Sequence, residues 1–232
     1  MSEIEQLVLS RDFPYLQPYF YNHPWALRCE LGAGNGKSAF RRRAWARVRE
    51  IHRILFPIPA DAVIFNYWMT DYSTTGGPWT QDCGQDAEAA ASVLKTEIAH
   101  ETRMLRFLET MQSRYRHVTV RNLPTYAVPG DPETGTLHHR VICYPDDRGF
   151  DELALLRRQM TEEEDTGLDI SLVSFANACI LSVYDDRGCD IVFASPDKLR
   201  TFYPLLEPFF LDYDREEMAR RLQAAEAAAE RA

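Results

Sequence analysis

The apolar run from Ala62 to Met69 constrains the fold of this chain more than any other segment. Its sequence is AVIFNYWM, which is rich in branched and aromatic side chains and shows no regular alternation of polar and apolar residues. Strands with this pattern lie inside a sheet that is covered on both faces. We therefore expect a central strand over about 61–69.

Two long helices are predicted to flank this strand along the chain. The first spans Lys37–Leu55, and Pro57 ends it. Its apolar residues recur every three or four positions, as a buried helical stripe requires: Phe40, Ala44, Val48, Ile51 and Leu55. The second spans about Asp86–Gln112, and we expect four residues to supply its inner face: Leu94, Ile98, Leu105 and Leu108.

The other elements are predicted to be short. Trp25–Leu31 alternates apolar and polar residues, which indicates a half-buried strand. Further strands are expected at 115–123 and 137–144, a β-meander at 169–175, 179–184 and 189–193, and a short helix at 151–164. Two helices finish the chain. One starts near Pro196 with Ser195 as its cap, and the other starts near Asp214.

This order of elements predicts an α+β fold: a mixed or mostly antiparallel sheet, helices packed against it and two C-terminal helices. The chain of 232 residues is long enough to bury a substantial core as one domain. A Pro- and Gly-rich stretch at 124–135 leaves open a division into an N-terminal lobe, 1–124, and a C-terminal lobe, 136–232.

Composition and charge narrow the class of protein. The net charge is −9, which argues against a general nucleic-acid binder, although residues 1–60 carry nine Lys/Arg against five Asp/Glu. Five widely spaced cysteines favour buried, reduced thiols over disulfides or zinc: Cys29, Cys83, Cys143, Cys179 and Cys189. With no signal-like or membrane-spanning segment, we expect a cytoplasmic protein without membrane contact.

Two features of the N-terminal region suggest ligands at first sight. Residues 31–38, LGAGNGKS, resemble a phosphate-binding loop, but Leu31 stands where that loop needs its first glycine. We therefore favour a turn followed by a helix start. The same helix carries arginines that could bind an acidic partner or nucleic acid, and the simpler interpretation is a solvated surface: Arg41, Arg42, Arg43, Arg47, Arg49 and Arg53.

Metal and nucleophile motifs are weak. Glu97 and His100 form one Glu-x-x-His pair, whereas di-metal bundles need two such pairs. His138 and His139 are adjacent in a predicted strand and so point to opposite faces. No GxSxG, HExxH or GxGxxG motif is present. We expect no metal or other cofactor.

The most distinctive segments lie near the C-terminus: YDDRGCDIVFA at 184–194 and FFLDYDREEM at 209–218. In the first, Asp185 and Asp186 are expected to cap a turn in which Gly188 adopts a positive φ. In the second, Asp214 is expected to cap a helix, with Glu217 completing a capping box. The functional alternative is that these charges converge into one polar site. Its candidate binding residues are Asp185, Asp186, Arg187, Asp190, Asp212, Tyr213, Asp214 and Arg215.

These segments carry a resemblance. YDDRGCDI, a following helix with Tyr203, and LDYDREEM resemble the bacterial domain-of-unknown-function family numbered 3885. YNHPWALRCELG at 21–32 is similar to that family's opening, although His23 and Phe210 stand where the family favours Trp. The resemblance implies a small cytosolic bacterial protein, and it implies no activity.

Two functions from different classes remain open. The first is a non-catalytic binding module, immunity- or adaptor-like, whose partner is another protein. The second is a metal-assisted hydrolase that uses five carboxylates as ligands or as acid and base: Asp185, Asp186, Asp190, Asp212 and Asp214. A concave pocket lined by these carboxylates would favour the enzyme. The sequence leaves the oligomeric state open.

Overall fold

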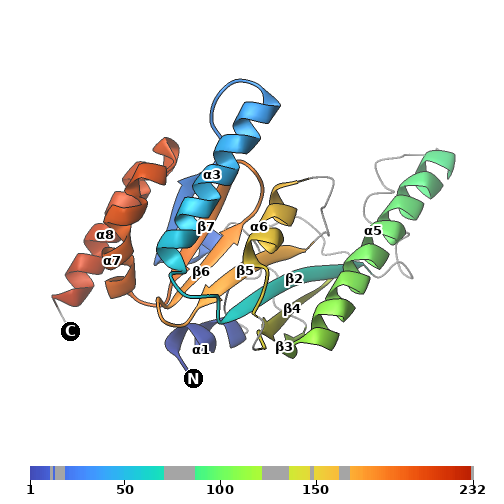
Figure 1. Ribbon diagram of the computed structural model, residues 1–232, viewed down its shortest axis with the longest axis horizontal. Coiled ribbons are helices and arrows are strands. Elements are labelled where there is room, and N and C mark those ends of the chain that lie inside the picture. The colour runs from blue at the N-terminus through green and yellow to red at the C-terminus, as the bar shows by residue number, and fades with distance from the viewer. Residues whose placement is uncertain are drawn as a thin grey trace.

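The computed structural model describes residues 1–10, 13, 19–70, 87–121, 136–146, 149–161 and 168–230. Within this part of the chain, seven strands form one sheet in the order β1-β7-β6-β5-β2-β4-β3, and all neighbouring strands are antiparallel (Figure 1). The strands are β1 (Ala26–Glu30), β2 (Ala62–Thr70), β3 (Arg116–Val120), β4 (Thr136–Tyr144), β5 (Asp169–Ser174), β6 (Cys179–Val183) and β7 (Gly188–Phe193). The predicted α+β class with an antiparallel sheet is confirmed.

Strand β2 lies inside the sheet, as its apolar run predicts. It pairs with β5 on one side and with β4 on the other. Val63, Ile64 and Phe65 are all fully buried, although consecutive residues of a strand point to opposite faces. Both faces of the sheet are therefore covered at this point.

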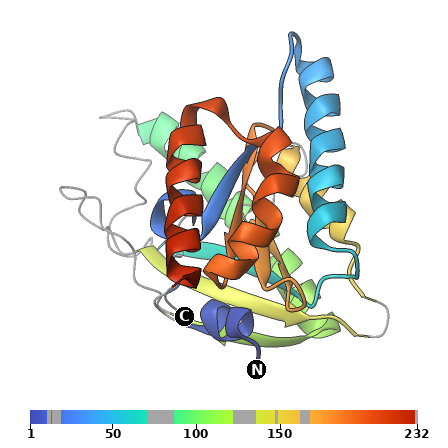
Figure 2. The same ribbon diagram turned by 90° about the vertical axis from the view of Figure 1, so that its left-hand side faces the viewer.

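Helices pack on both faces and at one edge. They are α1 (Glu3–Leu9), α2 (Tyr19–Asn22), α3 (Lys37–Leu55), α5 (Ala87–Arg114), α6 (Glu152–Met160), α7 (Pro196–Leu206) and α8 (Arg215–Ala229), with short 3-10 turns η3 (Glu207–Phe209) and η4 (Asp212–Asp214). Figure 1 shows α3, α5 and α6 on one side of the sheet, and Figure 2 shows α7 and α8 side by side next to its β1 end. No helix in the described ranges is both long and apolar enough to cross a bilayer.

The N-terminal segment covers the opposite face. Phe107 of α5 contacts Phe65, whereas Tyr19 of α2 accepts a hydrogen bond from Asn66, the next residue of β2. Because neighbouring residues of a strand point to opposite faces, α2 and α5 lie on opposite sides of the sheet. Neither α1 nor α2 was predicted from the sequence, and α2 places Phe20 beside the candidate site.

The helix predictions were right in position and partly wrong in detail. Helix α3 has the predicted bounds, and four residues of its predicted stripe are buried, namely Ala44, Val48, Ile51 and Leu55. The inner face of α5 was wrong in part: Met104, Leu108 and Met111 are buried there, while Ile98 is 47% exposed. The contact region of α5 is therefore its C-terminal half.

The predicted thiol state is confirmed for the cysteines that the structure describes. Cys29, Cys143, Cys179 and Cys189 are free and buried, and Cys83 lies outside the described residues. Burial raises the pKa of Cys143 and of Cys179 to about 12. Such thiols stay protonated near neutral pH, which suits a role in packing.

Candidate functional site

Arg28 is the point where the three family-like segments meet. Its guanidinium lies 5.1 Å from the ring centre of Phe20, 4.6 Å from that of Tyr21 and 5.8 Å from that of Tyr184. Its Nε donates to Oδ1 of Asp190 at 3.0 Å. Its Nη1 lies 3.7 Å from Oδ2 of Asp214. We call Tyr21, Arg28, Tyr184, Asp190 and Asp214 the Arg28 junction.

This junction is the end of a polar row across the sheet. Arg28 of β1 stands directly opposite Asp190 of β7, Asp190 opposite Ser182 of β6, and Ser182 opposite Ser171 of β5. The hydroxyl of Ser171 donates to that of Ser182 at 3.0 Å. The backbone N–H of Phe20 donates to Asp190 at 2.9 Å. Helix α2 thus packs over the Asp190 end of this row.

The location of Arg28 corrects the prediction for its strand. The alternation of residues 25–31 placed Ala26, Arg28 and Glu30 on a face opposite the apolar one, as in a half-buried strand. In the structure both Ala26 and Arg28 are buried. The reason is that α2 covers the face that the pattern left to solvent, and the charge of Arg28 is tolerated there only through its carboxylate and aromatic partners.

Burial sets the electrostatics of the junction. It raises the pKa of Asp190 even though the hydrogen bond and charge of Arg28 act in the opposite direction. Burial pulls the pKa of Arg28 down, but the hydrogen bond and charge of Asp190 outweigh it and raise that pKa overall. Burial, with the nearby charge of Asp190, also raises the pKa of Tyr184. The tyrosine therefore stays protonated and neutral.

The turn between β6 and β7 is held by its own charges. Asp185 accepts from the backbone N–H of Arg187 at 2.7 Å and pairs with the Arg187 side chain, as the capping interpretation required for this residue. Asp186 instead pairs with Arg41 of α3 at 3.6 Å. Arg187 extends from the tip with 78% of its side chain exposed.

Gly188 has a different role from the one predicted. The glycines with positive φ in the described residues are Gly34, Gly36 and Gly149, and Gly188 is not among them. A Cβ at Gly188 would lie 2.1 Å from the hydroxyl oxygen of Tyr184. The absence of a side chain at Gly188 leaves room for the hydroxyl end of Tyr184 and for the backbone oxygen of Cys29, which would lie 3.1 Å from that Cβ.

The second motif segment also departs from its predicted capping. Asp214 occupies the N-cap position of α8, but its side chain makes no capping hydrogen bond and is buried beside Arg28. Glu217 binds Arg220 and Arg221, so the capping box does not form. Hydrogen bonds from these two arginines lower the pKa of Glu217 to about 2. Ser195 likewise stands at the N-cap of α7 without a side-chain capping bond.

The candidate carboxylates therefore face arginines rather than one another. The pairs are Asp185 with Arg187, Asp186 with Arg41, Asp190 with Arg28, Asp212 with Arg215, and Asp214 with Arg28. Asp190 and Asp214 meet at Arg28, while the exposed Asp212–Arg215 pair flanks Tyr213, which is 87% exposed. Across the described residues, no group of three His, Cys, Asp or Glu side chains could hold a metal ion.

A pocket of about 380 Å³ lies beside the junction. Its lining combines charged and apolar residues: Cys29, Glu30, Gly32, Phe40, Tyr184, Arg187 and Leu211. We call it the Tyr184 pocket. Of these residues, only Arg187 was predicted from the sequence as a binding candidate. The others come from β1 and the residues just after it, the start of α3, the residue after β6 and the segment before η4, and only the folded chain brings them together.

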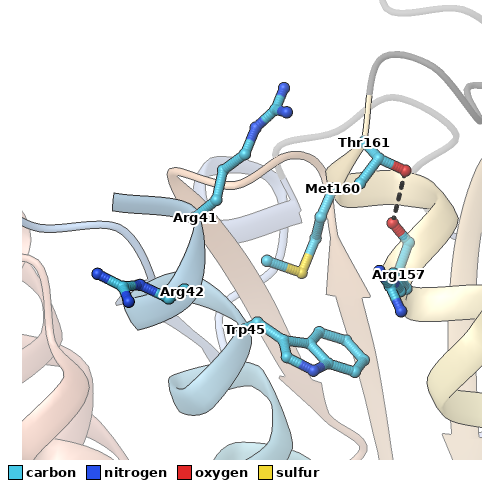
Figure 3. A pocket seen from close by; sticks show the side chains of 6 residues that line it. All are labelled: Arg41, Arg42, Trp45, Arg157, Met160 and Thr161. Carbon is cyan, nitrogen blue, oxygen red and sulfur yellow. Dashed lines mark hydrogen bonds between the residues drawn. The ribbon is translucent and has the colours of Figure 1, made fainter. Parts of the chain in front are cut away.

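A second hollow, of about 360 Å³, lies on the other side of the α3 N-terminal half. It is lined by Arg41, Arg42 and Trp45 of α3 and by Arg157, Met160 and Thr161 at the end of α6 (Figure 3). We call it the Trp45 groove. It contains part of the arginine surface for which the sequence favours a solvated helix face.

The weaker candidates take ordinary structural positions. The loop before α3 ends at Gly36, which has a φ of 90° and occupies the N-cap position. Glu97 and His100 lie in α5, and His138 and His139 are consecutive residues of β4. Three arginines of α3 are paired, Arg41 with Asp186, Arg47 with Glu30 and Arg53 with Glu50.

Comparison with known proteins gives a family and no activity. No curated protein and no solved structure matches the chain. A family model described as "Domain of unknown function (DUF3885)" matches residues 6–214. This range includes Arg28, Tyr184, Asp190 and Asp214, the four residues through which the family-like segments meet. The match covers most of the chain, and the chain therefore belongs to the DUF3885 family.

Proposed function

We propose that this chain is a non-catalytic protein-binding module, immunity- or adaptor-like, whose partner docks at the Tyr184 pocket. The pocket carries this proposal because its lining joins the apolar side chains of Phe40 and Leu211 to Tyr184 and to the exposed Arg187. Tyrosine and arginine are enriched among the residues that dominate binding energy at protein interfaces. The partner is expected to insert one apolar side chain and to contact Arg187.

The state of the carboxylates supports binding over hydrolysis. A metal-assisted hydrolase needs oxygens that are free to coordinate a cation or to move a proton. Each of the five candidate carboxylates has an arginine nitrogen within 4 Å. Asp190 in addition accepts from the backbone of Phe20, so its oxygens are already used in holding α2 on the sheet.

The exposed aromatic residues extend the proposed docking surface. Tyr21 packs on Arg28 yet is 58% exposed, and Tyr213 precedes the buried Asp214 and is 87% exposed. Tyr21 is therefore the solvent-exposed member of the Arg28 junction, and Tyr213 adjoins the junction through Asp214. Exposed tyrosines offer a partner a large contact area at a low cost in side-chain entropy.

An affinity capture from the native host tests this proposal. The bait is the full chain, with Arg187→Glu as the pocket variant and Arg200→Glu as the control, because Arg200 is an exposed, ion-paired arginine on α7. We expect a recurrent partner that wild type and Arg200→Glu recover equally and that Arg187→Glu recovers about tenfold less. Equal recovery by Arg187→Glu would overturn the pocket as the docking site.

A direct activity measurement tests the non-catalytic part. The full chain is assayed with Mg²⁺ or Mn²⁺ against phosphate-ester, peptide and ester substrates, next to Asp186→Asn. No turnover above the metal-only background supports the module. A turnover that Asp186→Asn abolishes while the circular dichroism spectrum is retained would establish an enzyme instead.

A further inference from the structure

The Trp45 groove has the composition of a peptide-binding site. Figure 3 shows the indole of Trp45 and the thioether of Met160 in the middle of the groove, with Arg41 and Arg42 on one side and Arg157 on the other. Trp45 is only partly buried, so its ring is available to a ligand. Methionine adapts its shape to different apolar partners. The groove therefore offers an apolar floor between two positive walls.

Two of the three arginines in the positive walls have no acidic partner among the described residues, while the third, Arg41, pairs with Asp186. Neither Arg42 nor Arg157 has an acidic side chain within ion-pair distance in the part of the chain that the structure describes, and both are exposed. Helix α3 carries seven Lys/Arg and one Glu in a chain whose net charge is −9. This concentration of charge marks the groove as complementary to an acidic ligand.

We infer that the Trp45 groove binds an acidic segment of a partner protein that places one apolar side chain on Trp45 and Met160. A volume of about 360 Å³ accommodates a leucine or phenylalanine side chain with its adjoining backbone. Carboxylates on either side of that anchor reach Arg42 and Arg157. Guanidinium groups bind carboxylates through paired, charge-assisted hydrogen bonds.

A protein segment fits the groove better than a nucleic acid does. Binding to single-stranded nucleic acid needs a row of aromatic rings on which successive bases stack, and Trp45 is the one aromatic residue lining the groove among the residues that the structure describes. The overall charge of −9 also repels a long polyanion at distances beyond the local patch. A short acidic segment experiences mainly the local positive field.

The groove is a site of its own and does not depend on the Tyr184 pocket. The described linings of the two hollows have no residue in common. Arg41 connects them, because it lines the groove and pairs with Asp186 of the β6–β7 turn. The inference therefore survives or fails independently of the proposed docking at Arg187.

NMR titration of the full, ¹⁵N-labelled chain tests the inference at Trp45. The probe is a short synthetic peptide of glutamates around one central leucine, and the Trp45 indole signal is assigned with Trp45→Phe. We expect this signal to shift and saturate, and the double variant Arg42→Glu/Arg157→Glu to bind about tenfold more weakly or less. Both arginines are exposed, so folding should be retained, and thermal unfolding checks it. Arg200→Glu is the matched control, and it should bind as wild type does.

Three further titrations decide between occupants. A peptide with glycine in place of the leucine should bind more weakly, and equal binding would remove the apolar anchor. If a single-stranded oligonucleotide shifts the Trp45 signal at a lower concentration than the acidic peptide does, the ligand of the groove is a nucleic acid and not a protein segment. An unshifted Trp45 signal with the acidic peptide would overturn the site. Arg187→Glu should leave peptide binding unchanged, so that failure here and failure of the proposed docking site are told apart.

Discussion

Arg28 and Asp190 stand opposite each other on β1 and β7, and Nε of the arginine donates to the carboxylate at 3.0 Å while Phe20 donates to the other oxygen at 2.9 Å. Asp190 is fully buried, and Arg28 is nearly so. Their ion pair joins two neighbouring strands of the sheet that are the first and the last in the chain, and it holds α2 against both. The family-like residues thus fasten segments that are far apart in the sequence.

Asp190→Asn should destabilise the protein by about 3–5 kcal/mol, because it leaves the charge of Arg28 buried without its main partner. Urea unfolding followed by circular dichroism measures this loss. Asp186→Asn is the control: its carboxylate is partly exposed and 3.6 Å from Arg41, so a loss below about 1 kcal/mol is expected. A similar, small loss in both variants would contradict the role given to Asp190.

Removing both charges should be less harmful than removing one. Asp214 also lies beside Arg28, so we make Arg28→Met/Asp190→Leu in an Asp214→Asn background, where no buried carboxylate loses its arginine. No side chain there requires a counter-charge, so we expect this double variant to be more stable than Asp190→Asn in the same background. Urea unfolding midpoints of the single and double variants, measured at one pH, give the coupling between Arg28 and Asp190 in stability. A double variant that is the least stable of the set would show that the pair contributes more than mutual neutralisation.

His23 should make stability depend on pH below neutrality. Burial, and then the charge of Arg221, lower its pKa from 6.5 to about 4, and its Nδ1 accepts the N–H of Trp25 at 3.2 Å. As the pH falls, His23 is therefore protonated at a higher pH in the unfolded chain than in the folded one. Stability from this group is complete above pH 6.5 and is lost as the pH falls toward 4, by at most about 3 kcal/mol. His23→Asn keeps a hydrogen-bond acceptor but does not titrate. The free energy of unfolding in urea should therefore change less between pH 6.5 and pH 4 in this variant than in wild type. An equal change in both proteins would show that another group causes the pH dependence.

Arg140 should control the attachment of the N-terminal segment. It is fully buried, and it donates to the backbone oxygens of Val8 at 3.0 Å and Phe13 at 3.2 Å and to Asn66 at 3.1 Å. Arg140→Met removes every donor and leaves these carbonyls buried without that partner. Relative to wild type, we expect Arg140→Met to speed amide exchange more in α1 than in β2. The control is Arg116→Met on exposed β3, and equal protection of α1 in both variants would contradict the prediction.

Local patterns predicted most of the elements and little of the junction. The apolar stripe of α3 and the following Pro57 predicted the bounds of this helix correctly, because both signals lie in the helix or directly beside it. Arg28 was assigned to a solvent-facing side because the pattern of its strand carries no information about α2, which packs there. The pairing of Arg28 with Asp190 depends on the β1–β7 register across a sequence separation of 162 residues. Capping at Asp214 failed because Arg28, a tertiary partner, lies beside its carboxylate.

Gly32→Ala should displace the Phe40 ring in the Tyr184 pocket. A Cβ at this position would lie 1.9 Å from the Phe40 ring, so the ring must move at a cost of about 1–3 kcal/mol. Phe40→Ala removes the clash, and Gly32→Ala should then cost less in that background. Gly34→Ala is the control: Gly34 has a φ of +103°, and a Cβ there would meet no described atom within 4 Å, so its cost comes from backbone strain and should not change with Phe40→Ala. If the two glycine variants respond alike to Phe40→Ala in thermal unfolding, close packing of Phe40 on Gly32 is not what requires the glycine.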